Sequence, residues 1–243
     1  MESRNFILSS LTPAEEELIR PHLVPVSLPH KMTYYRPQES IRHVWFIEQG
    51  CASVINLLPD GGATEVGTIG NEGLVGTPIL LETDRIPNLC EMQIPGHGWQ
   101  MPAQALATAL HRSESLRTKL LRFAQAHYNQ VAQTAACNRL HSLEERCARW
   151  LLMSRDRAGE DFPLTHEYLA IMLGVRRAGV TVTANVLQSA GLIRHTRGHI
   201  TITDPAGLEE VTCDCYWIVR EEFRRLLPQG EEYPSPQQGP SSD

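Results

Sequence analysis

The chain has 243 residues, which is enough for one large domain or two ordinary ones. Hydrophobic residues make up 42% of it, so a sizeable core can be buried, and the formal net charge of -6 argues against an indiscriminate binder of nucleic acid. A sequence-specific binder is not excluded, because its positive charge can be confined to one surface.

No run of apolar residues approaches the roughly 20 that a membrane-spanning helix needs, and residues 1–10 lack the long apolar run of a secretory signal. The six cysteines are scattered along the chain. Scattered cysteines suit reduced thiols better than a disulfide framework. We therefore expect a cytoplasmic protein with no membrane partner.

Residues 1–111 are expected to form a sensor domain. It opens with a short helix at 11–23, which Thr12 caps and Pro13 begins. From about residue 24 to 101, short β-rich runs such as 43–49 and 52–58 alternate with Pro, Gly, Asp and Asn. This spacing is typical of a compact antiparallel sandwich or roll.

Residues 113–137 contain no glycine or proline and are predicted to form one long helix. A stripe of mostly apolar side chains recurs on it at spacings of three and four residues, near the coiled-coil period. The stripe consists of Leu116, Leu120, Phe123, His127, Val131 and Ala135. It could lie on the roll of the same chain, but a long stripe between two domains favours a second copy. We predict a parallel homodimer and assign residues 112–141 to a dimerisation helix and hinge.

The stretch from 165 to 203 reads as helix, tight turn, helix and short β-hairpin. Ala170, Gly174 and Val180 have the small–glycine–branched spacing with which a helix-turn-helix packs. Glycine suits the turn, because it adopts a positive φ most easily. This pattern predicts a winged helix-turn-helix.

Segments on both sides extend this domain to residues 142–227. Ser142 and Glu145 form the capping-box pattern that opens a preceding helix. Asp204-Pro205 starts a further helix, which is expected to run to about residue 227. Residues 228–243 are rich in Pro, Gln, Ser and Gly, and we predict a disordered tail there.

Arginines give the motif its local positive charge. Arg176 and Arg177 open the second helix, whose first turn enters the major groove, while Arg194 and Arg197 flank the hairpin turn of the wing. Arginine can bond two acceptors of a guanine or a phosphate. The predicted base contacts come first from Arg177 and then from Arg176, Thr181 and Asn185. The predicted phosphate contacts come from Thr165, His166, Arg194, Arg197 and His199.

A β-rich first half, a long helix and a winged helix-turn-helix, in that order, resemble the Crp–Fnr family of bacterial transcription regulators over about residues 11–227. The stretches that carry the resemblance are HVWFIEQGCASV (43–54), GTIGNEGLVG (67–76) and LGVRRAGVTVTANVLQSAGLI (173–193). The resemblance implies an α+β fold, with an N-terminal antiparallel β-roll of the cyclic-nucleotide-binding type, a double-stranded β-helix. It also implies a homodimer that binds a pseudo-palindromic operator in double-stranded DNA and recruits or blocks RNA polymerase.

The effector cassette departs from that of cyclic-nucleotide-binding members. The positions that match are Gly70, Glu72, Gly73 and, near the family's arginine, Arg85. Ile86 and Pro87 follow where a hydroxyl residue is expected, so a hydroxyl and a backbone donor for the phosphate are lost. We expect a roll that binds another small molecule or none, and no cofactor.

The recognition helix departs as well. Family members open it with Ser or Thr, then Arg, Glu and Thr, whereas this chain has Arg176, Arg177, Ala178 and Gly179. Alanine replaces the acidic base reader, so the operator should differ from the family consensus.

The alternative is a thiol- or metal-responsive regulator that uses Cys213 and Cys215. On one regular helix these two side chains would lie about 200° apart, so we expect packing thiols and no metal site. An iron–sulfur centre is not expected, because the first cysteine is Cys51, and a haem would have only His43 or His97 as candidate ligands on the roll. Residues 96–99 supply one histidine where a metal oxygenase needs several, and neither a nucleophile elbow nor a P-loop is present. We therefore predict no enzyme and no catalytic residue.

Overall fold

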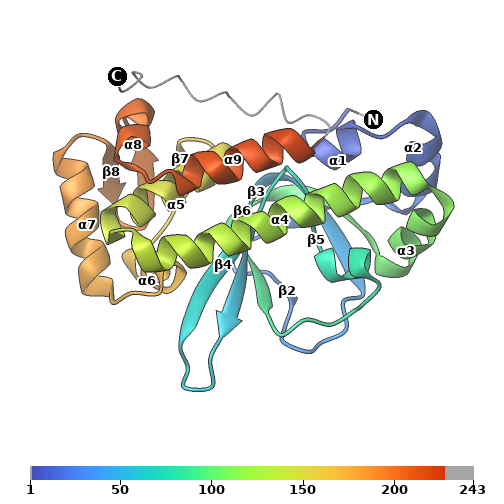
Figure 1. The fold of residues 1–243 in the computed structure, drawn as a ribbon, viewed down its shortest axis with the longest axis horizontal. Helices are drawn as coiled ribbons and strands as arrows, with labels where there is room; N and C mark the ends of the chain where they lie inside the picture. Colours follow the sequence, from blue (N-terminus) through green and yellow to red (C-terminus); the bar gives the residue numbers. More distant parts are fainter. Residues whose placement is uncertain (1, 228–243) are drawn as a thin grey trace.

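The computed structural model describes residues 2–227 (Figure 1). Antiparallel strands build the N-terminal roll: β1 (Val24–Leu28), β2 (Thr33–Tyr35), β3 (His43–Leu57), β4 (Ala63–Ile69), β5 (Leu74–Val75) and β6 (Leu89–Pro102). They are ordered β1-β6-β3-β4, with β2 paired to β6 and β5 paired to β3. The predicted α+β class with an antiparallel roll is confirmed. The runs predicted at 43–49 and 52–58 are one long strand, β3.

Strands β3 and β6 form the long central ladder of the roll, which runs from the pair His43–Pro102 to the pair Ile55–Leu89. The register shifts around Gly50, whose φ of 103° favours glycine. Opposite it, a Cβ on Gly96 would lie 1.8 Å from the carbonyl oxygen of Gln49. These glycines allow the backbones to approach closely where the sheet bends.

Short helices close the ends of the roll. They are α1 (Phe6–Ser9), α2 (Pro13–Ile19), the 3-10 helices η1 (Arg20–His22) and η2 (Thr77–Leu81), and α3 (Ala103–Arg112). As predicted, Pro13 begins α2 and Thr12 caps it, in a capping box with Glu15. Apolar side chains from these helices join the strands in one core.

The long helix α4 (Glu114–Leu140) crosses the roll (Figure 1). The stripe residues that it buries are Leu116, Leu120, Phe123 and His127, whereas Val131 is half-buried and Ala135 is exposed. The prediction that this stripe packs against a second copy is therefore wrong. The stripe covers the chain's own roll, where Phe123 lies so close to Gly73 that a Cβ there would be 1.9 Å from its ring.

The second domain consists of α5 (Leu143–Ala158), β7 (Asp161–Pro163), α6 (His166–Leu173), α7 (Arg177–Ser189), β8 (Ile193–Thr196), β9 (His199–Ile202), α8 (Pro205–Val211) and α9 (Cys215–Leu226). Its strands form a small antiparallel sheet in the order β7-β9-β8. Ser142 and Glu145 form the predicted capping box at the start of α5. The domain shares a hydrophobic core with Cys51, Ile55 and Ile94 of the roll, so the two domains are packed together.

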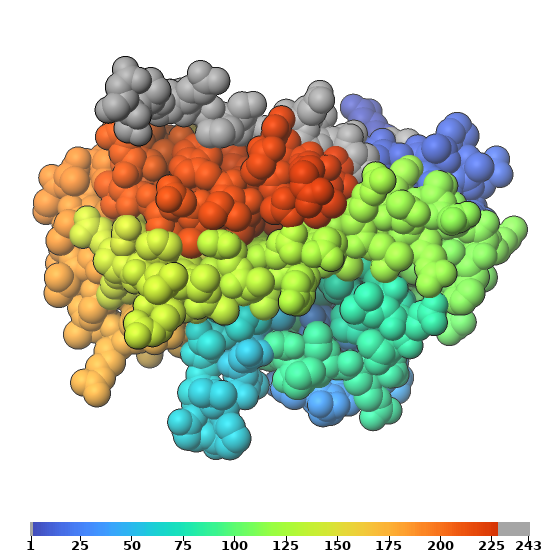
Figure 2. Space-filling model, viewed as in Figure 1, coloured from blue at the N-terminus to red at the C-terminus, as the bar shows by residue number. Residues whose placement is uncertain are grey.

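The last segment differs from the prediction. One helix was expected after Asp204-Pro205, but the chain breaks at Thr212–Asp214 into α8 and α9. Helix α9 then returns along α4, and Figure 2 shows the two helices side by side on the surface. The disordered tail predicted at 228–243 lies outside the described residues.

Candidate nucleic-acid interface

Helices α6 and α7 meet at the tight turn that the sequence predicts. The hydroxyl oxygen of Thr165 accepts a hydrogen bond from the backbone N–H of Tyr168 at 3.1 Å, which caps α6. Gly174 ends the helix with a φ of 62°, and its backbone N–H bonds back to Ala170 and Ile171. Ala170 and Val180 are buried where the helices cross. The predicted packing of the motif is confirmed.

Helix α7 presents a mixed face to solvent. Its exposed predicted contacts are Arg176, Arg177 and Asn185, and Thr181 is half-buried. The hydroxyl of Thr181 donates to the carbonyl of Arg177 at 3.1 Å. The β-branched run at 180–183 is helical here, because Val180 and Thr183 point into the domain. A Cβ on Gly179 would lie 3.1 Å from Leu143, so glycine keeps α7 close to α5.

Sequence reasoning missed two apolar members of this face. Val182 is 65% exposed and Val186 is 45% exposed, four residues apart on α7. A methyl-bearing side chain in the major groove can contact the methyl group of thymine. The sequence feature that could have revealed these two residues is the pair of valines on either side of Asn185, on a helix face that is otherwise polar.

The predicted phosphate contacts lie at the start of α6 and on the wing. Arg194, Arg197 and His199 are exposed, and Gly198 turns the hairpin with a φ of 84°. The imidazole Nδ1 of His199 lies 3.7 Å from the carboxylate of Asp161. An acidic group therefore adjoins the wing on its β7 side.

His166 stacks on His195, a wing residue that the prediction omitted. Their ring centroids lie 4.0 Å apart, and Nδ1 of His166 lies 3.2 Å from the hydroxyl oxygen of Thr181. Burial, together with the charges of His195 and Arg177, lowers the pKa of His166. Burial also lowers the pKa of His195. The lowered pKa values favour the uncharged imidazole rings, and the stacked pair thus links α6, α7 and the wing.

Comparisons with solved structures agree with this architecture. A protein from Eubacterium rectale, described as a transcriptional regulator of the Crp/Fnr family, superposes with a TM-score of 0.66 at 19% identity, covering 84% of this chain and 96% of the other. FixK2 from Bradyrhizobium japonicum gives a TM-score of 0.67 at 16% identity over 79% and 98% of the two chains. The c-di-GMP-responsive regulator CLP of Xanthomonas campestris gives 0.60 at 16% identity over 79% and 99%. These likenesses show the fold.

The helix-turn-helix region also matches a known family. Residues 145–211 match the family model of the Crp-like helix-turn-helix domain. The second domain therefore carries a Crp-like helix-turn-helix. No curated protein sequence matches the chain. Within residues 2–227, no helix is long and apolar enough to cross a membrane.

The segment expected to form an effector cassette is occupied by side chains of the chain itself. The carboxylate of Glu72 is fully buried and pairs with the guanidinium of Arg157 from α5 at 2.7 Å. The backbone N–H of Gly70 donates to the same carboxylate at 3.1 Å. A Cβ on Gly70 would lie 2.5 Å from the Arg157 side chain. Arg85, by contrast, is exposed and pairs with Asp84 at 3.6 Å.

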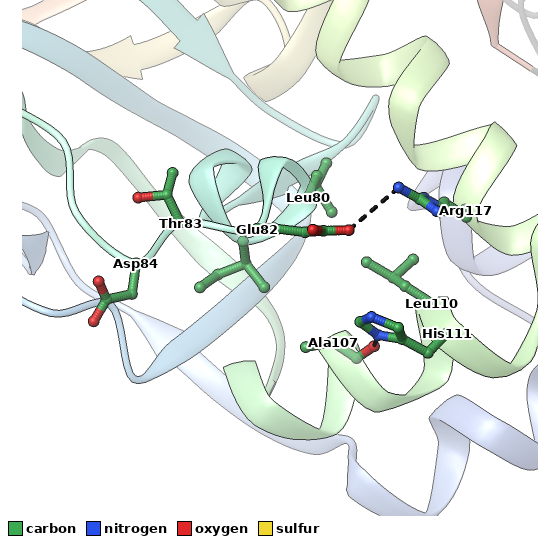
Figure 3. A pocket seen from close by; sticks show the side chains of 9 residues that line it. Leu80, Glu82, Thr83, Asp84, Ala107, Leu110, His111 and Arg117 are labelled. Atoms are coloured by element: carbon green, nitrogen blue, oxygen red, sulfur yellow. Dashed lines mark hydrogen bonds and ion pairs between the residues drawn. The ribbon is translucent and has the colours of Figure 1, made fainter.

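A hollow of about 430 Å³ lies elsewhere on the roll (Figure 3). It is lined by η2 with the loop that follows it, and by α3 and α4. An ion pair between Glu82 and Arg117 spans it at 3.3 Å. Neither Glu72 nor Arg85 is among its lining residues.

Polar contacts join the roll to the helix-turn-helix domain. The indole N–H of Trp150 donates to the Glu65 carboxylate at 2.9 Å, and the Tyr168 hydroxyl donates to Glu91 at 2.9 Å. Burial raises the pKa of Glu65 to about 7, against the opposing hydrogen bonds from Ser53 and Trp150. Together with the ion pair between Glu72 and Arg157, these contacts connect the roll directly to the second domain.

Proposed function

We propose that the chain is a transcription regulator of the Crp–Fnr type, which acts in the cytoplasm as a homodimer and reads a pseudo-palindromic operator through recognition helices led by arginine. The observation that carries this proposal is the exposed face of α7, where Arg176, Arg177 and Asn185 stand on a helix whose opposite side is buried. Arg177 is the first base reader in this proposal. The wing and the start of α6 hold phosphates on either side of the groove.

The dimer is proposed to form through the side of α4 that faces away from the roll. Its members follow one another at spacings of four and three residues: Leu121, Gln125, Tyr128, Ala132 and Ala135. Leu121 is 37% exposed and Tyr128 is 66% exposed. Two parallel copies joined here would carry their recognition helices into successive major grooves about 34 Å apart.

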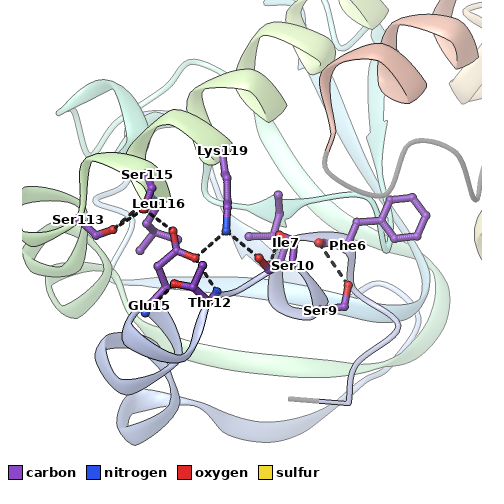
Figure 4. A network of polar contacts seen from close by, with 10 residues as sticks. All are labelled: Phe6, Ile7, Ser9, Ser10, Thr12, Glu15, Ser113, Ser115, Leu116 and Lys119. Atoms are coloured by element: carbon purple, nitrogen blue, oxygen red, sulfur yellow. Dashed lines mark hydrogen bonds and ion pairs between the residues drawn. The ribbon is translucent and has the colours of Figure 1, made fainter.

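The start of α4 is well fixed for this role (Figure 4). The ammonium of Lys119 donates to the Glu15 carboxylate at 2.6 Å and to the carbonyl of Ser10 at 2.7 Å. Although burial opposes it, hydrogen bonding from Lys119 and Ser115 lowers the pKa of Glu15 to about 2. The helix is thus anchored to the N-terminal segment at one end and to α9 along its side.

The effector is proposed to be a small molecule other than a cyclic nucleotide, if the roll takes one at all. Two observations support this: the Glu72 carboxylate is already paired with Arg157, and Arg85 is exposed beside Asp84. In this proposal, a change in the conformation of the roll reaches α5 through Gly70, Glu72 and Gly73. RNA polymerase, which the regulator would recruit or block, is the further partner.

Selection of bound DNA from a random pool tests the base-reading assignment. Arg177→Ala should weaken binding to the selected operator by about 1–3 kcal/mol and relax the preference at one position in each half-site. Arg36→Ala, which removes an exposed arginine from the roll, is the matched control and should bind as the unaltered protein does. Equal affinity and equal preference in Arg177→Ala would contradict the assignment.

A further inference from the structure

Three cysteines and one histidine converge where α4 ends and α9 begins. They are Cys137, His141, Cys213 and Cys215, and their ligand atoms all lie within 4.8 Å of one another. Cys137 is in the last turn of α4 and His141 is its C-cap, while Cys215 is the first residue of α9. Cys213 lies in the break before α9, not on the helix. The expectation that Cys213 and Cys215 point apart on one helix is therefore wrong.

Two distances within this Cys–His cluster match edges of a zinc tetrahedron. The sulfur atoms of Cys137 and Cys213 are 3.6 Å apart, and the sulfur of Cys215 is 3.5 Å from Nδ1 of His141. With Zn–S bonds of about 2.3 Å and Zn–N bonds of about 2.0 Å, tetrahedral geometry sets these edges at about 3.8 and 3.5 Å. These two pairs of donors are thus spaced for a tetrahedral metal, and all four ligand atoms lie within 4.8 Å of one another.

The surroundings suit thiolate ligands. The three cysteines are buried and form a cluster of their own, and His141 is half-buried. The side-chain amide of Gln133 donates to the sulfur of Cys215 at 3.1 Å, an outer contact that orients a ligand. Arg149 interacts electrostatically with Cys137, and its buried Nε has no hydrogen-bond partner among the described residues. Its positive charge would offset the negative charge of a three-thiolate site.

We propose that this Cys–His cluster is a zinc site with Cys137, His141, Cys213 and Cys215 as its four ligands. Sulfur-rich, tetrahedral sets select zinc among common divalent ions, and four protein ligands leave no open position for catalysis. Binding would release the thiol protons to solvent and join the end of α4 to the start of α9. The site stands without the regulator proposal, and only its effect on operator binding rests on it.

Metal analysis of the reduced full-length protein tests the site. We expect one Zn²⁺ per chain, retained through dialysis, and a tetrahedral thiolate spectrum when Co²⁺ replaces it. Cys213→Ala should lower the affinity for Zn²⁺ by at least about 10-fold, because losing a ligand costs no less than losing an outer contact. Cys147→Ala, which removes a buried cysteine of α5 outside the cluster, is the matched control and should keep both metal and spectrum.

A second variant protects the test against misfolding. His141 is half-buried at the helix end, so His141→Asn should fold, which circular dichroism checks, and should still lose affinity and change the Co²⁺ spectrum. Absence of Zn²⁺ uptake by the reduced protein overturns the proposal. Equal uptake by Cys213→Ala, His141→Asn and the unaltered protein also overturns it. Zinc binding is scored without DNA, so its failure is distinguishable from failure of operator binding.

Discussion

Glu65 lies at the contact between the roll and α5, where it accepts hydrogen bonds from Ser53 and Trp150. Burial raises its pKa to about 7, whereas a carboxyl of the unfolded chain has its usual pKa near 4.5. As the pH rises from 4.5 to 7, the unfolded chain therefore gives up this proton before the folded one does. The folded state consequently loses stability over that window.

Replacing Glu65 with Gln removes the ionisation and keeps the shape. We expect Glu65→Gln to be more stable than the unaltered protein at pH 8, by up to about 3 kcal/mol, and the difference to shrink toward pH 5. Urea denaturation at the two pH values measures it. His127, whose pKa burial lowers to about 4, contributes the opposite slope, but both proteins contain it. A difference that does not depend on pH would refute the explanation.

At the scale of elements, the loop at 70–73, between β4 and β5, is tied to α5 through Glu72 and Arg157. The two side chains are almost fully buried and their charged atoms lie 2.7 Å apart. Removing one partner of such a pair leaves a buried charge alone, which costs about 3–5 kcal/mol. Removing both leaves no such charge.

A double-mutant cycle tests this tie. Arg157→Met should destabilise the protein by about 3–5 kcal/mol in urea denaturation. Adding Glu72→Gln to Arg157→Met should recover part of that loss, because the unpaired carboxylate is gone. If the losses of the two single variants simply add in the double variant, the ion pair does not couple the loop to α5.

The side of α4 that faces away from the roll is the proposed dimer face. Tyr128→Asp places a charge in the middle of the proposed dimer face, and loss of a central tyrosine should weaken the dimer by about 30-fold or more. Sedimentation of the 27.2 kDa chain over a concentration series measures this. Val24→Asp, which changes an exposed apolar residue on β1, is the control and should leave the mass unchanged. A monomeric unaltered protein would contradict the proposed face.

At the scale of the whole molecule, local signals in the sequence predicted most of the architecture. Thr12 and Ser142 cap the helices that they were expected to cap, and Gly174 makes the turn of the motif, because caps and turns depend on neighbouring residues. The apolar period of α4 predicted a buried stripe but could not say what buries it. Whether the roll or a second copy buries the stripe depends on the surface of the roll, where Gly73 leaves space for the ring of Phe123.

The parts that the sequence could not predict depend on distant segments meeting. Arg157 is 85 residues from Glu72, and no sequence pattern in either segment indicates that the two side chains pair. Likewise, Cys137 and Cys213 meet only because α9 returns along α4, after a break at 212–214 that helix propensity did not reveal. The base-reading and phosphate-binding roles of Arg176, Arg177 and the wing residues stay predictions.

Two copies of the chain are proposed to read one symmetric operator, and footprinting of the protein on its selected DNA is the decisive test. We expect protection of two half-sites, related by two-fold symmetry and centred about 34 Å apart on one face of the duplex. The complex should contain two chains per duplex. A single unsymmetric half-site held by one chain would contradict it.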